Sequence, residues 1–328
     1  MSDLVLRVQD LQVSFHSAMG RTLALDGLSL EVAARQIVGV VGESGCGKST
    51  LGMASAALLP PAAQIDHGTV QVAGQDLASL SEKELRGLRG REIGVIFQEP
   101  MTALNPVMRV GDQIAEGVRV QESISARAAW SRAVDALERV GLPDPAARAR
   151  SYPHQLSGGM RQRVVIAMAI TGRPKLIVAD EPTTALDVTV QAQILDLLRD
   201  LGRELDAGVM IITHDLGVIA DVADDIAVMY AGRKIESGST RALFQRPEHP
   251  YTVGLLRAIP AAVSGSGREG TRLHEIPGRV PTLDAPINAC TFADRCPRVV
   301  DACRTGRPDL DPAAHGGLVA CIRPHGQE

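Results

Sequence analysis

A glycine-rich stretch that ends in a lysine and a serine is the clearest chemical signal in the chain. Residues 42–49 read Gly-Glu-Ser-Gly-Cys-Gly-Lys-Ser and fit G-x-x-x-x-G-K-[ST] at every fixed position. An apolar run precedes them and a helical pattern follows, so the loop is expected to turn its backbone N–H groups toward phosphates. Lys48 should then reach the β- and γ-phosphates of a nucleotide, and Ser49 should bind Mg²⁺. Cys46 is either a small unreactive filler or a thiol whose pKa is lowered by the helix N-terminus.

Two carboxylates follow a second apolar run further along the chain. Residues 176–179 are apolar and lead directly into Asp180 and Glu181. At the carboxyl end of a buried parallel strand, this order suits a Mg²⁺-binding Asp180 and a water-orienting Glu181 in a phosphate-hydrolysing site. An apolar run before two acids is common by itself, so this prediction depends on the presence of the phosphate loop.

The elements that must position these groups can be predicted from hydrophobic periodicity. Alternation over residues 4–29, interrupted by Gly20 and Gly27, indicates an antiparallel N-terminal sheet. Helical spacing over about 101–155 indicates a helical insertion. Further along, apolar strands alternate with helices, which favours a mostly parallel α/β sheet. These segments are the strands at 176–179, 209–212 and 226–229 and the helices at 159–171 and 190–205.

The amino-acid composition of the sequence changes after about residue 260. Residues 264–267 read Ser-Gly-Ser-Gly, which is typical of a flexible linker, and the remainder is rich in Pro, Gly and Cys. We therefore predict two units, a nucleotide-binding domain at 1–260 and a small cysteine-rich extension at 261–328.

Composition limits the classes of function. The chain has 328 residues, with 34 Lys+Arg against 38 Asp+Glu and a net charge of −4, and 45% of its residues are hydrophobic. It can bury a substantial core, and it lacks the basic excess of a nucleic-acid-binding protein. We therefore expect no nucleic acid partner. Neither a long apolar run nor a signal peptide is visible, so we expect a cytosolic chain whose membrane spans, if any are needed, belong to other subunits.

A third motif distinguishes among the protein families that share a phosphate loop. Residues 156–163 read Leu-Ser-Gly-Gly-Met-Arg-Gln-Arg, which resembles the signature of ATP-binding-cassette (ABC) ATPases, although Met160 stands where that family usually has Gln. Ser157 and the two glycines open a predicted helix, so their N–H groups form an anion site. In this family the signature caps the γ-phosphate that is held by the other subunit of a dimer. The implied fold is the α/β P-loop NTPase fold of ABC ATPases, with a mostly parallel core sheet, an antiparallel β subdomain and a helical subdomain.

Four further residues each match a single position of this family. Gln98 resembles the Q-loop glutamine, which senses Mg²⁺ and the attacking water, and His214 resembles the switch histidine at the γ-phosphate. Asp187 resembles the D-loop aspartate at the dimer interface, and Phe15 resembles the aromatic that stacks on adenine. The alternatives are a core position for Phe15, a histidine satisfied within the sheet for His214, and a solvated loop amide for Gln98.

The resemblance thus implies a complete set of site residues, with ATP and Mg²⁺ as ligands. The catalytic set is Glu181, His214 and Gln98, and the Mg²⁺ set is Ser49, Gln98 and Asp180. The implied ATP-binding residues are Phe15, Gly42, Glu43, Ser44, Gly45, Cys46, Gly47, Lys48, Ser49, Thr50, Gln98 and His214. The implied signature residues, which act on the partner's ATP, are Leu156, Ser157, Gly158, Gly159 and Met160.

Two longer segments indicate a branch of the family. Residues 97–106 and 249–256, together with the cysteine-bearing tail, resemble the ATPase subunits of dipeptide, oligopeptide and nickel importers. The resemblance implies coupling of ATP hydrolysis to peptide uptake, at the cytoplasmic face of the inner membrane. It also implies a second, similar but distinct ATPase chain, two integral permease subunits and an extracytoplasmic substrate-binding protein. The permease is expected to contact the helical insertion near residues 98–105.

Three other functions stay open at this point. The first is an importer ATPase for nickel or another small solute. The second is a soluble ABC ATPase of DNA repair or translation, although the chain has neither a second cassette nor a long coiled-coil insertion. The third is a metal-regulated binding module whose nucleotide site is only regulatory.

The tail holds four of the five cysteines of the chain, Cys290, Cys296, Cys303 and Cys321. A reducing cytosol disfavours disulfides, which leaves a metal site or plain buried thiols. The spacing lacks the C-x₂-C pairs of a zinc ribbon, and Pro297 follows Cys296 as in some cluster-binding runs. The resemblance to peptide-importer ATPases implies a [4Fe–4S] cluster, while zinc and no metal are the alternatives.

Overall fold

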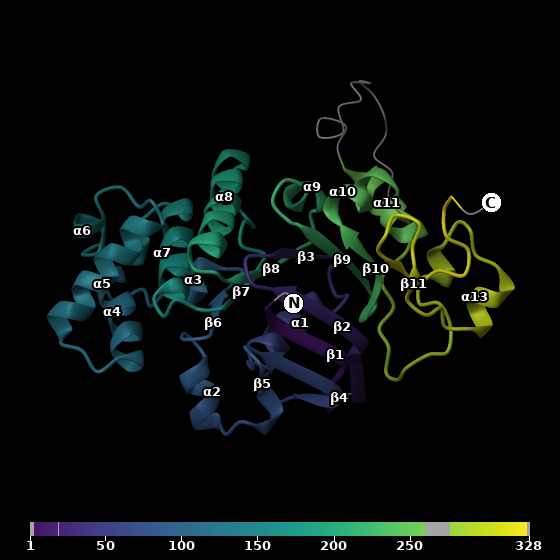
Figure 1. Ribbon diagram of the computed structural model, residues 1–328, viewed down its shortest axis with the longest axis horizontal. Coiled ribbons are helices and arrows are strands. Elements are labelled where there is room, and N and C mark those ends of the chain that lie inside the picture. The colour runs from purple at the N-terminus through teal and green to yellow at the C-terminus, as the bar shows by residue number, and fades with distance from the viewer. Residues whose placement is uncertain (1–2, 19, 260–275, 327–328) are drawn as a thin grey trace.

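The computed structural model describes residues 3–18, 20–259 and 276–326. The linker predicted at 264–267 and the boundary predicted at 260/261 lie outside the described residues. Figure 1 shows a group of helices at one end of the molecule, two sheets in the middle, and the segment 276–326 at the other end. We call residues 276–326 the C-terminal region.

The larger sheet is mostly parallel, as the sequence predicts. Its strand order is β11-β12-β10-β9-β3-β8-β7-β6, and the pairs from β9 to β6 are parallel. The strands are β3 (Ile37–Val41), β6 (Ile93–Ile96), β7 (Leu176–Asp180), β8 (Gly208–Thr213), β9 (Asp225–Tyr230), β10 (Arg233–Ser239), β11 (Asp311–Pro312) and β12 (Leu318–Val319). Every residue of β3 and β8 is buried, because the sheet is covered on both faces, and this explains their continuous apolar sequences.

The smaller sheet confirms the predicted antiparallel N-terminal unit. Its order is β2 (Gly20–Ala33), β1 (Leu4–Ser17), β4 (Ala63–Val72) and β5 (Gln75–Asp76). The first two strands form a hairpin that pairs Ser17 with Gly20. Their inward side chains share one core with α1 (Lys48–Ser55), so this sheet packs against the helix that follows the phosphate loop.

The helices of the insertion form a lobe beside the edge strand β6 (Figure 1). We call this group the helical lobe; it comprises α3 (Pro100–Ala103), α4 (Val110–Gln121), α5 (Ala126–Arg139), α6 (Pro145–Arg148), η2 (Pro153–Gln155) and α7 (Gly158–Ile170). Among the described residues, the remaining helices before the C-terminal region are η1 (Leu77–Ser79), α2 (Glu82–Leu88), α8 (Val188–Glu204), α9 (Leu216–Ile219), α10 (Thr240–Gln245) and α11 (Pro250–Ala258). The predicted helices at 159–171 and 190–205 correspond to α7 and α8.

The C-terminal region shares a sheet and a core with the rest of the chain. Strand β12 pairs with β10 through Glu236 and Val319, and β11 pairs with β12. Its two short helices are η3 (Ala293–Arg295) and α13 (Asp301–Thr305). The buried ring of Phe292 packs edge-on against Tyr230 and Tyr251, with ring centroids 5.2 and 5.4 Å apart. The region is therefore anchored to β9 and α11 by aromatic contacts.

None of the helices within residues 3–18, 20–259 and 276–326 has the length and apolar character needed to cross a bilayer.

Candidate nucleotide-binding site

The phosphate loop joins β3 to α1 and depends on glycine at its last turn. Gly47 is the N-cap of α1 with φ of 102°, a conformation that L residues rarely adopt. A Cβ atom there would also lie 2.4 Å from the carbonyl oxygen of Ala24. Gly45 has φ of 82° and open space around it. The loop can therefore present backbone N–H groups at the start of a helix only because glycine occupies these positions.

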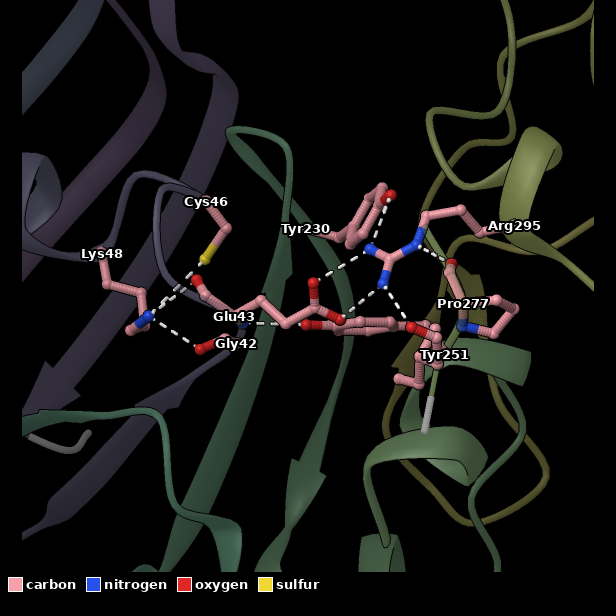
Figure 2. Close-up of polar contacts among 9 residues, drawn as sticks. Gly42, Glu43, Cys46, Lys48, Tyr230, Tyr251, Pro277 and Arg295 are labelled. Atoms are coloured by element: carbon pink, nitrogen blue, oxygen red, sulfur yellow. Dashed lines mark hydrogen bonds and ion pairs between the residues drawn. The ribbon is translucent and has the colours of Figure 1, made fainter. Parts of the chain in front are cut away.

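Lys48 and Cys46 belong to this loop, and their side chains contact each other (Figure 2). The Nζ atom of Lys48 donates to the carbonyl oxygens of Gly42 at 2.7 Å and Glu43 at 3.0 Å. These contacts keep a buried ammonium group beside the loop, where phosphate oxygens could bind it. Cys46 is 1% exposed, and burial raises the pKa of its thiol despite the nearby Lys48. Of the two interpretations given to this residue, burial and the raised pKa favour the small unreactive filler.

Asp180 ends β7 beside the loop. Burial raises the pKa of its carboxyl group, the neighbouring Glu181 carboxylate adds to that effect, and a hydrogen bond with Ser49 opposes it. Its Oδ1 atom is buried and makes no hydrogen bond within the described residues. A desolvated carboxylate oxygen without a donor is well placed for a cation, so Asp180 and Ser49 fit a Mg²⁺ site.

Glu181 joins the two predicted residues that come from distant loops. Its Oε1 lies 2.9 Å from Nδ1 of His214, and its Oε2 accepts hydrogen bonds from Gln98 Nε2 and Thr184 Oγ1, both at 2.8 Å. Burial raises the pKa of Glu181, but the hydrogen bonds from His214 and Thr184 outweigh it, so the net pKa is lowered. Glu181 also adopts a positive φ of 45°, a strained conformation of the kind found at functional sites. Thr184 is not among the site residues predicted from the sequence.

A cavity of about 370 Å³ lies above the phosphate loop and has room for a nucleotide. Phe15, Gln98 and Glu181 all line it, so Phe15 lies on the cavity wall rather than fully within the core. The other lining residues predicted from the sequence belong to the loop and α1: Ser44, Gly45, Gly47, Lys48, Ser49 and Thr50. The lining residues that were not predicted come from β2, the β9–β10 turn and the C-terminal region: Thr22, Leu23, Ala24, Ala231, Gly232, Pro281, Thr282 and Leu283.

The signature residues 156–160 lie away from this cavity. Ser157 is the exposed N-cap of α7, and its Oγ accepts from the Met160 N–H at 3.3 Å. Asp187 caps α8 in the same way through Val190. Among the described residues, none from 156–160 lines the cavity above the phosphate loop. Within one chain, therefore, the signature and the phosphate loop do not face the same space.

The four cysteines of the C-terminal region line one small cavity beside His249 and Phe292. Burial raises the pKa of the Cys321 thiol to about 11, so its thiol is protonated in the protein alone. Although the cysteines gather at one place, the described part of the chain holds no group of three or more Cys, His, Asp or Glu side chains arranged to bind a metal ion. The structure thus places the four predicted cysteine ligands around one cavity, but their sulfur atoms are not arranged to bind a metal ion.

Comparisons with known proteins identify two matching families, similar proteins and similar solved structures. Residues 25–184 match the family described as ABC transporter, and residues 235–303 match the oligopeptide/dipeptide transporter, C-terminal region. The chain is similar to a probable peptide ABC transporter ATP-binding protein of Sinorhizobium fredii, with 46% identity over 98% of this chain and 96% of that protein. It is similar to the dipeptide transport ATP-binding protein of Bacillus subtilis, with 48% identity over 97% of this chain and 94% of that protein. A solved dimeric ATP-binding cassette, bound to ADP and phosphate after hydrolysis, is 27% identical, with a TM-score of 0.65 over 72% of this chain and 99% of that chain.

Proposed function

The chain belongs to the ABC transporter family, whose cassettes hydrolyse ATP, and we propose that it is the ATP-hydrolysing subunit of a peptide importer. The observation that carries the peptide class is the match of residues 235–303 to the oligopeptide/dipeptide transporter C-terminal region. The named relatives, at 46% and 48% identity over nearly the whole chain, point to the same class. They favour peptides over nickel or another small solute, and transport over a role in DNA repair or translation.

The chemistry proposed for this chain follows from the positions of its side chains. Lys48 and the N–H groups of the loop bind the phosphates of ATP, and Ser49 and Asp180 hold the Mg²⁺ ion that accompanies them. When bound, the ion would supply positive charge beside the phosphate oxygens. Glu181, kept ionised by its hydrogen bonds, accepts a proton from the attacking water or orients it. Gln98 and His214 fix the direction of that carboxylate.

Partners are a further part of the proposal. ATP binding would stabilise a closed pair of ATPase chains, and that differential stability would drive two permease subunits between their inward- and outward-facing states. Large apolar side chains are exposed at the start of the helical lobe and suit a permease surface: Phe97 (46% exposed), Met101 (44%) and Val107 (79%). A substrate-binding protein would deliver the peptide from outside, and the chain would work at the cytoplasmic face of the membrane. We propose a similar but distinct chain as the second ATPase.

The cysteines support one more component, a [4Fe–4S] cluster held by Cys290, Cys296, Cys303 and Cys321. Four thiols around one cavity are the donor set that such clusters use. The sulfur atoms would have to lose their protons and converge, because the described residues do not present them as a ligand set. Zinc on the same thiols and four plain buried thiols are the competing outcomes.

The transport proposal can be tested in membrane vesicles that contain this chain together with any permease subunits that co-purify with it. We expect ATP-dependent uptake of labelled di- and oligopeptides, and we expect Lys48→Ala in this chain to abolish it. Uptake of Ni²⁺ without peptide uptake would replace the peptide class by the nickel class. Co-purification with ribosomes or DNA, and with no integral membrane protein, would refute a transport role.

A further inference from the structure

Arg295 of the C-terminal region reaches into the phosphate loop (Figure 2). Its Nη1 atom lies 2.9 Å from Oε2 of Glu43, and its Nη2 atom lies 3.1 Å from Oε1. The guanidinium group therefore donates to both carboxylate oxygens. The Arg295 side chain is 7% exposed and that of Glu43 is 28% exposed. Bidentate arginine–carboxylate pairs fix the relative orientation of the two side chains in addition to pairing their charges. Partial burial protects such a pair from screening by salt.

The guanidinium is itself held in place. Its Nε donates to the carbonyl oxygen of Pro277 at 2.7 Å, and Nη2 donates to that of Ile276 at 3.1 Å. Nη1 also lies 3.2 Å from the hydroxyl oxygen of Tyr230, on β9. Arg295 therefore cannot change rotamer without losing several hydrogen bonds. It is a rigid link between the C-terminal region, the core sheet and the loop.

Glu43 is the residue through which this link reaches the phosphate loop and Lys48. Its N–H donates to the hydroxyl oxygen of Tyr251 at 2.9 Å, while its carbonyl oxygen accepts from Nζ of Lys48 at 3.0 Å. The side chain, the N–H and the carbonyl oxygen of one loop residue are thus all engaged. Two of these three contacts come from outside the loop, and the third is made to the lysine expected to bind phosphate.

A second contact joins the C-terminal region to the other side of the same site. Leu23 donates its N–H to the carbonyl oxygen of Leu283 at 2.6 Å. Residues 281–283 then form part of the wall of the nucleotide cavity, next to β2. The C-terminal region therefore borders the cavity at one place and holds its phosphate loop at another.

We propose that Arg295 is a positioning residue for ATP, through which the C-terminal region of this chain holds the phosphate loop in its binding conformation by way of Glu43. The inference rests on the proposed ATP site. A loop that is already ordered loses less conformational entropy when the nucleotide binds, so the link favours binding without touching the ligand.

The test uses the full-length chain and measures the dissociation constant for Mg·ATP by calorimetry. Arg295→Met should raise this constant about tenfold, which corresponds to about 1.4 kcal/mol. Arg295→Lys keeps the charge but not the two-pronged contact, and it should recover part of the loss. The matched control is Arg304→Met, because Arg304 pairs with Asp294 on the surface of the same region, with 53% and 86% of the two side chains exposed. It should leave the constant unchanged.

A double-mutant cycle separates positioning from general loss of stability. If Arg295 acts through Glu43, the Arg295→Met and Glu43→Gln effects on ATP affinity will not add, and the double variant will bind about as well as either single variant. Additive effects, or an unchanged constant in Arg295→Met, would overturn the proposal. Lys48→Ala serves as the reference: if it too leaves binding unchanged, the ATP site assignment itself is wrong. Glu43→Gln and Arg295→Lys keep the test open should Arg295→Met fail to fold.

Discussion

Glu181 is the residue on which two distant segments of the chain converge. Its two oxygens contact Gln98, Thr184 and His214, and the hydrogen bonds from His214 and Thr184 lower its pKa against the effect of burial. A carboxylate that remains ionised at neutral pH can accept a proton from water that attacks a phosphate. The arrangement thus favours a chemical role for Glu181 and orienting roles for its neighbours.

Replacing this carboxylate gives a direct prediction. Glu181→Gln keeps the shape and a hydrogen-bond acceptor but removes the charge, so ATP turnover in the assembled transporter should fall by about 10²–10⁴ while ATP binding survives. Turnover and binding are measured on the same preparation. Glu204→Gln is the matched control, because Glu204 pairs with Arg139 on the surface, and it should behave as wild type. Turnover near the wild-type rate in Glu181→Gln would contradict the assignment.

Residues differ in how far their positions could be predicted from the sequence. Lys48, Ser49 and Asp180 lie in contiguous motifs, and the parallel sheet brings the ends of β3 and β7 to the same edge. Arg295 meets Glu43 across 252 positions of sequence, and no local pattern marks an arginine for such a contact. Pro281, Thr282 and Leu283 were missed for the same reason, since only the path of the chain places them at the cavity.

Among the elements, long periodic segments were predicted and short ones were not. The continuous apolar runs in β3 and β8 indicate buried strands, and the amphipathic helix α8 has 17 residues, enough for its helical period to be visible. Strands β11 and β12 have two residues each, which is too few for a period. Their pairing with β10 is nevertheless what makes the C-terminal region continuous with the core sheet.

The cysteine-lined part of that region gives the second prediction. If the four thiols hold a [4Fe–4S] cluster, protein purified without oxygen should be brown, absorb broadly near about 400 nm, and contain iron and sulfide. Cys303→Ser should lose the iron, because Cys303 is a buried member of the group. The control is Cys46→Ser, whose sulfur lies in the phosphate loop, and it should keep the iron content. Colourless protein with one zinc would overturn the iron–sulfur choice, and metal-free protein would leave four buried thiols.

At the scale of the whole molecule, the signature residues 156–160 and the cavity at the phosphate loop lie apart within one chain. The helical lobe and the C-terminal region lie at opposite ends of the molecule, with the sheets between them (Figure 1). The cavity above the phosphate loop is bordered by the C-terminal region, whereas the N-terminus of α7 is exposed and does not line it. The N-terminus of a helix can bind an anion such as a phosphate. A second chain, approaching with its own phosphate loop, would supply one.

Variants at two helix caps test this shared site. Ser157→Arg should leave Mg·ATP binding to this chain largely intact, because Ser157 is not on the cavity, but it should block closure of the pair and stop ATP turnover in the assembled transporter. Lys48→Ala should instead weaken binding by this chain itself. Ser125 caps α5 in the same manner, with its Oγ 3.2 Å from the Ala128 N–H, so Ser125→Arg carries the same loss of a cap and should retain turnover. If an isolated chain hydrolyses ATP at the full rate whatever its concentration, the two chains do not share their sites and the role given to Ser157 is wrong.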